Sequence, residues 1–150
     1  MELKKNSIYT IEITDMGNEG EGIGHLSLSD VANNKTGTDI STKASSEDGN
    51  NVQNITVFVK DTVIGDVAEI SIMKAKKSIA YGRLVRLITP SPYRVTPVCP
   101  VAKSCGGCSL QHISYEKQLE YKWNKVRECL RRIGKIENPD TLMEPIYGMK

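Results

Sequence analysis

Three of the four cysteines in this 150-residue chain lie within ten residues, from Cys99 to Cys108. Their spacing is C-x5-C-x2-C, with Cys105 in the middle. Clustered thiolates are the preferred ligands of zinc and of iron–sulfur clusters. Gly106 and Gly107 allow the backbone to bend tightly between two sulfurs. Because the chain shows no secretory context, we expect these thiols to bind a metal and not to form disulfides.

The first 90 residues predict a small, mainly β barrel. Five short segments carry the alternation or the glycine content of half-buried strands. They are 7–14, 16–25, 55–59, 67–73 and 79–88. The residues expected to face the core in the third and fourth are Ile55, Val57, Val59, Ala68, Ile70 and Ile72. Short strands in this number imply a closed or nearly closed barrel.

Glycine occupies every second position from Gly20 to Gly24. This pattern favours a sharply coiled strand, where backbones approach closely. The same spacing occurs in loops that bind S-adenosylmethionine or a dinucleotide, but such a loop requires a helix directly after it. Residues 25–30 show no helical period, so we favour the strand.

Residues 29–54 are mostly Ser, Thr, Asn, Asp, Gly and Lys. A segment of this composition buries too little apolar surface to offset its ordering entropy. We therefore expect a disordered loop inserted between two strands. Each doubling of a loop's length costs only about 0.6 kcal/mol, so the barrel tolerates it.

A proline-rich linker at 91–98 follows the barrel, and one amphipathic helix follows the cysteines. We expect Ser114 to be the N-cap of a helix from Tyr115 to Ile133, where apolar residues recur every three or four positions. The stripe consists of Tyr115, Leu119, Trp123, Val126, Leu130 and Ile133. Trp123 is expected in a core, and Cys129, beside the stripe, is expected to be a packed thiol.

The segment 99–112, with its Cys-Pro, Cys-Gly-Gly-Cys and Ser-Leu-Gln-His sequences, resembles the RNA (uracil-5-)-methyltransferases of the iron–sulfur, ribosomal-RNA type. The resemblance implies that Cys99, Cys105 and Cys108 hold a 4Fe–4S cluster together with a fourth cysteine from a distant catalytic domain. Cys129 lies where the family pattern has no ligand, and remains only a possible substitute.

The strand order, the Ile-Gly-Asp turn at 64–66 and the lysine-rich hairpin look like a TRAM domain, an OB-like RNA-binding barrel. The resemblance divides the chain into four parts. They are a TRAM-like barrel at 1–90, the linker at 91–98, a cluster loop with its helix at 99–135, and the start of a central or catalytic region at 136–150.

OB-like barrels bind single-stranded nucleic acid through basic grooves and stacking aromatics. Residues 1–60 carry five basic and nine acidic side chains, whereas residues 61–100 carry six and three and residues 101–150 carry nine and six. This shift toward positive charge is consistent with a polyanion-binding face. The candidate RNA contacts are Lys74, Lys76, Lys77, Tyr81, Arg83, Arg86 and Arg94.

The resemblance implies that such an enzyme methylates C5 of a uracil with S-adenosylmethionine, through a cysteine that adds to C6. We assign no catalytic residue within this chain. We expect RNA, ribosomal RNA in particular, as the partner, and neither DNA nor a membrane. With no apolar run of membrane-spanning length and no signal-peptide core, we expect a cytoplasmic protein.

Two other functions stay open. The chain is compatible with a free-standing TRAM-type RNA-binding module, whose thiols bind a structural zinc or are vestigial. It is also compatible with the radical enzymes that carry a TRAM domain. In those enzymes the cluster motif precedes the barrel, whereas here it follows, so this alternative ranks last.

Overall fold

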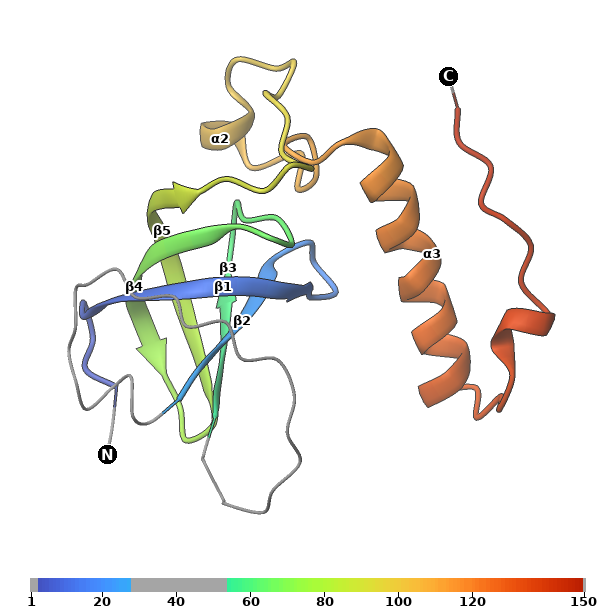
Figure 1. The fold of residues 1–150 in the computed structure, drawn as a ribbon, viewed down its shortest axis with the longest axis horizontal. Helices are drawn as coiled ribbons and strands as arrows, with labels where there is room; N and C mark the ends of the chain where they lie inside the picture. The colour runs from blue at the N-terminus through green and yellow to red at the C-terminus, as the bar shows by residue number, and fades with distance from the viewer. Residues whose placement is uncertain (1–2, 28–53, 150) are drawn as a thin grey trace. The chain divides into compact units, whose positions relative to one another are not determined.

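The structure, a computed structural model, describes residues 3–27 and 54–149 (Figure 1). It contains two compact units: one spans residues 1–17 and 21–92, and the other spans 18–20 and 93–150. The loop expected at 29–54 lies, apart from Asn54, outside the described residues. Among the described residues, no helix is long and apolar enough to cross a membrane.

The first unit is a closed five-stranded barrel, which confirms the predicted fold class. The strands are β1 (Ile8–Met16), β2 (Gly22–Leu26), β3 (Ile55–Val59), β4 (Val67–Ala75) and β5 (Ile79–Thr89). Their order around the barrel is β1-β2-β3-β5-β4, and β1 pairs with β4 to close it. All pairs are antiparallel except β3 with β5, which are parallel.

The barrel core consists of the alternate residues that the sequence pattern predicted. Val57 and Val59 of β3 and Ile70 and Ile72 of β4 are completely buried. Gly22 and Gly24 lie in β2, as expected, and not in a cofactor loop, whereas Gly20 lies in the turn before β2 with φ 85°. A Cβ added at Gly24 would lie 2.6 Å from the carbonyl oxygen of Glu12, so the backbones of β1 and β2 approach too closely there for any side chain.

The second unit contains a short helix α2 (Ala102–Cys105), the long helix α3 (Tyr115–Arg132) and a 3-10 turn η1 (Pro139–Thr141). Helix α3 begins where the sequence predicted and ends one residue earlier. Ser114 is its N-cap residue, but the Ser114 side chain makes no capping hydrogen bond. The helix is anchored instead by Gln118, whose side-chain amide donates to the carbonyls of Leu110 and Ile113 at 3.0 and 2.8 Å.

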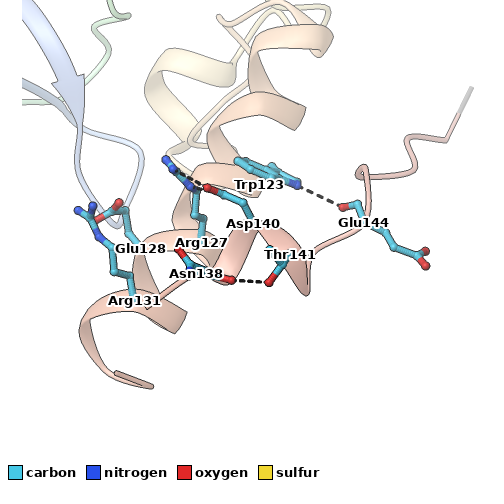
Figure 2. A network of polar contacts seen from close by, with 8 residues as sticks. All are labelled: Trp123, Arg127, Glu128, Arg131, Asn138, Asp140, Thr141 and Glu144. Atoms are coloured by element: carbon cyan, nitrogen blue, oxygen red, sulfur yellow. Dashed lines mark hydrogen bonds and ion pairs between the residues drawn. The ribbon is translucent and has the colours of Figure 1, made fainter. Parts of the chain in front are cut away.

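No residue of α3 is buried by the residues that the structure describes. The prediction that Trp123 lies in a core is therefore wrong for this structure: the indole is half-buried, and its Nε1 donates to the Glu144 carbonyl at 3.2 Å (Figure 2). Arg127 forms an ion pair with Asp140 of η1, and the segment after η1 runs back along the helix (Figure 1). This segment shields one side of Trp123, and near its end the Met149 amide donates to the Tyr115 hydroxyl at 2.8 Å. Val126 and Ile133 of the stripe remain exposed.

Candidate metal centre and nucleic-acid interface

The cysteine loop is held shut at its base by backbone hydrogen bonds. The amide of Val95 donates to the His112 carbonyl at 3.0 Å, and the amide of Ser114 donates to the Tyr93 carbonyl at 2.8 Å. Between them, Arg94 and Ile113 form an isolated antiparallel bridge, with Ile113 almost fully buried. These bonds bring the two ends of the loop together, so all three predicted ligands lie on one closed segment.

Within that loop, Cys99 is half-buried, and Cys105 and Cys108 are exposed. The Cys99 amide donates to Oε1 of Gln111 at 3.3 Å. Cys105 is the last residue of α2, and Gly106 then reverses the chain with φ 70°. This left-handed conformation favours glycine, as the sequence predicted for a tight bend between two sulfurs.

All three thiols are free, but the structure does not gather them. In the described part of the chain, no three Cys, His, Asp or Glu side chains are close enough to hold one metal ion. The donor set therefore suits an iron–sulfur cluster or zinc chemically, whereas the sulfurs are not arranged around a common centre. Closing the site requires movement of the exposed loop that carries Cys105 and Cys108.

Cys129 was expected to be a packed thiol, and this prediction is wrong: its side chain is exposed. It lies on α3 and lines a shallow apolar depression with Val126, Leu130 and Ile133. The reason is that no described residue covers this flank of the helix. The helix pattern correctly placed Cys129 beside the stripe, but it could not tell whether that surface has a partner.

The candidate RNA contacts on the barrel gather around β4, β5 and the turn between them. Lys74 of β4 lies directly opposite Tyr81 of β5, and Arg83 lies opposite Ser71. Lys76 and Lys77 occupy the connecting turn, which is closed by a 2.7 Å hydrogen bond from the Lys76 amide to the Ile79 carbonyl. All four basic side chains are exposed.

The sequence left open whether Tyr81 belongs to the core, and the structure places it outside. Its neighbours Ala80 and Gly82 face into the barrel, whereas Tyr81 is 45% exposed. Its ring stacks on Phe58 of β3, with centroids 5.7 Å apart and an interplanar angle of 26°. Sequence reasoning missed Phe58. Its position between the inward residues Val57 and Val59 was the signal that it faces outward.

Two predicted contacts already have partners within the protein. Arg86 forms a two-pronged ion pair with Glu69, at 2.7 and 3.1 Å. This pairing lowers the pKa of the Glu69 carboxyl and raises the pKa of the Arg86 guanidinium. Arg94 is half-buried in the second unit, at the base of the cysteine loop. In the described part, Lys74, Lys76, Lys77 and Arg83 have no such partner.

Four of the six basic residues of α3 pair with carboxylates. Lys117 pairs with Glu120, and Arg127 pairs with Asp140. Arg131 and Arg132 share Glu128, each at 2.9 Å. Because Arg131 and Arg132 share one carboxylate, and Lys122 and Lys125 have no acidic partner among the described residues, α3 keeps part of its positive charge, as the barrel hairpin does.

Comparison with known proteins matches residues 2–85 to the TRAM domain. The chain belongs to the TRAM-domain family. The TRAM barrel is thus the first compact unit, and residues 28–53 come between its strands β2 and β3 in the sequence.

The relatives that match most of the chain are proteins named RNA methyltransferases. A Clostridium acetobutylicum protein named an uncharacterized RNA methyltransferase is 41% identical over 148 residues, which is 99% of this chain and 26% of that protein. A Clostridium tetani protein of the same description is 38% identical over 148 residues, again 99% and 26%. One from Bacillus cereus is 46% identical over 99 residues, 66% of this chain and 21% of that protein. The chain spans about a quarter of the length of these relatives. The predicted resemblance is confirmed as far as a TRAM domain and similarity to proteins named RNA methyltransferases.

Proposed function

We propose that this chain is the RNA-binding and iron–sulfur portion of an S-adenosylmethionine-dependent RNA (uracil-5-)-methyltransferase that acts on ribosomal RNA. One observation carries the proposal: a TRAM barrel is followed by a C-x5-C-x2-C loop in a chain that aligns over almost its whole length with proteins named RNA methyltransferases. Methyl transfer and its cofactor belong to the remainder of such an enzyme, so the 150 residues alone bind RNA without methylating it.

In this proposal Cys99, Cys105 and Cys108 hold a 4Fe–4S cluster, with the fourth ligand outside this chain. Such a cluster supplies cross-links to a segment with little core of its own. The loop has that need, because Ile113 and Pro139 are the only buried apolar residues described between 93 and 149. The backbone hydrogen bonds at the base of the loop already hold its two ends together. Binding of the cluster therefore needs to order only the residues between those ends.

The test is to purify the 150-residue chain without oxygen and to measure iron, sulfide and zinc per polypeptide. We expect about four irons and four sulfides. They should be lost in Cys99→Ser, Cys105→Ser and Cys108→Ser, and kept in the matched control Cys129→Ser.

One tightly held zinc and no iron would contradict the cluster and support a binding module with a structural zinc. Loss of iron in Cys129→Ser as well would show that Cys129, although outside the loop, completes the ligand set.

A further inference from the structure

We infer that the outer face of β3, β5 and β4 is a site for single-stranded RNA, in which one unpaired base stacks on Tyr81. The phosphates on either side of that base reach Arg83 and Lys74. This inference rests on the proposed RNA-binding function and adds to it the class of RNA and the contacts that select it.

The strand register carries the first step. Phe58, Tyr81 and Lys74 are direct cross-strand neighbours on β3, β5 and β4. Adjacent strands are about 4.8 Å apart, so the three side chains form one row about 10 Å across. Arg83 lies two positions further along β5, about 7 Å from Tyr81 on the same face.

The second step is the state of the Tyr81 ring. One face of the ring is supported by Phe58 at 5.7 Å, and 45% of the residue remains exposed. Packing against Phe58 restricts the side chain before any ligand arrives, which lowers the entropy lost on binding. Base stacking requires an accessible aromatic side chain, which the exposed part of Tyr81 supplies, and every base has a matching face.

The third step concerns charge. Glu69 is the only acidic residue of β4 and β5, and it already forms an ion pair with Arg86. Lys74 and Arg83 therefore flank the Tyr81 ring without an acidic partner in the described residues. Lys76 and Lys77 extend the same positive surface into the turn. The site is complementary to a polyanion on both sides of the aromatic ring.

Together these features favour an unpaired strand over a duplex. In a double helix both faces of each base are covered by neighbouring base pairs, so no base can lie flat on Tyr81. A single strand offers a free base face and flexible phosphates at once.

The test measures binding of the 150-residue chain to a fluorescent 12-nucleotide RNA of mixed sequence, single-stranded or annealed to its complement. We expect the single strand to bind at least tenfold more tightly than the duplex. Tyr81→Leu should weaken single-strand binding about tenfold, and Tyr81→Phe, which keeps the ring, should stay within about twofold. Tyr147→Leu is the matched control, because Tyr147 is 85% exposed and far from the barrel strands in sequence.

Salt dependence tests the two phosphate contacts separately. Each single-strand phosphate contact contributes about 0.7 to the slope of log affinity against log salt. Lys74→Gln and Arg83→Gln should each reduce the slope by about that amount. The double variant Glu69→Gln/Arg86→Gln, which removes an arginine without changing net charge, should leave the slope unchanged.

The outcomes separate this inference from the function on which it rests. If wild-type chain binds the RNA but Tyr81→Leu binds equally well, the stacking site is wrong and the RNA-binding function stands. Equal affinity for the duplex would overturn the single-strand class. If the wild-type chain binds neither RNA, both the site and the RNA-binding function fail.

Discussion

The buried carboxylate of Asp66 accepts a hydrogen bond from the backbone amide of Ser91, 25 residues later, at 2.8 Å. Its second oxygen accepts from the Val63 amide at 2.7 Å, and the Ser91 hydroxyl donates to the Ile64 carbonyl at 2.6 Å. The turn before β4 is thereby tied to the residue that follows β5. The Ile-Gly-Asp turn, which the sequence singled out only as a family mark, fixes where the chain leaves the barrel.

Replacing this carboxylate should destabilise the barrel. In Asp66→Ala two buried amides lose their acceptor, and each such loss costs about 1–3 kcal/mol. Urea unfolding followed by circular dichroism should show a fall of that order or more in the free energy of unfolding. Ser91→Ala removes one hydroxyl bond and keeps the amide contact, so its loss should be near 1 kcal/mol. Equal losses for the two variants would contradict the central role of Asp66.

A side chain at Gly24 should also destabilise the barrel. The added carbon of Gly24→Ala would meet the Glu12 carbonyl at 2.6 Å, a backbone atom that cannot rotate away. Overpacking of this kind costs about 1–3 kcal/mol. The control is Gly107→Ala, whose nearest described contact is the Cys105 sulfur at 3.4 Å. Unfolding of the barrel should be unaffected by the control, and unchanged stability in Gly24→Ala would exclude the close approach.

The pair of Glu69 and Arg86 predicts a specific dependence on pH. The hydrogen bond from Arg86 lowers the pKa of the Glu69 carboxyl from its ordinary value of 4.5. The ion pair therefore stabilises the folded state above that pH. The contribution is lost as the pH falls through the lowered folded pKa. The free energy of unfolding of wild type should therefore exceed that of Glu69→Gln at pH 7.

This difference between wild type and Glu69→Gln should disappear in acid, once the carboxyl is protonated in both the folded and the unfolded states. Urea titrations at a series of pH values measure it. High salt at pH 7 should shrink the difference as well, because the Arg86 side chain is 65% exposed and ions in the solvent screen the pair. A difference that persists well below the lowered pKa would point to packing of the Glu69 side chain and not to its charge.

The barrel could be predicted from the sequence because its signals are local. Alternation in residues 55–59 and 67–73 identified the inward residues Val57 and Ile70 correctly, since the side-chain period of a strand is fixed by its geometry. The sequences of β3 and β5 do not indicate that these two strands pair in parallel. For this reason the contact between Phe58 and Tyr81, which joins two strands distant in sequence, was missed.

The second unit shows where periodicity stops being informative. The stripe of α3 correctly predicted a helix, but a stripe does not say what covers it. Trp123 and Cys129 were both expected to be packed, and the residues described here leave one half-buried and the other exposed. Likewise, charge counts could not separate Arg83 from Arg86, because the partner of Arg86 lies on the neighbouring strand.

Release of the segment after η1 should be visible in the emission of Trp123, the only tryptophan. The Arg127–Asp140 ion pair holds η1 against α3, and the indole donates to Glu144 in the segment that follows η1 (Figure 2). Asp140→Asn weakens the ion pair, so the ring should become more exposed and its emission maximum should move to longer wavelength. Glu137→Gln, which removes an exposed carboxylate of the same region, is the control and should leave the spectrum unchanged. An unshifted spectrum in Asp140→Asn would mean that the hydrogen bonds from Trp123 to Glu144 and from Met149 to Tyr115 hold the segment without the ion pair.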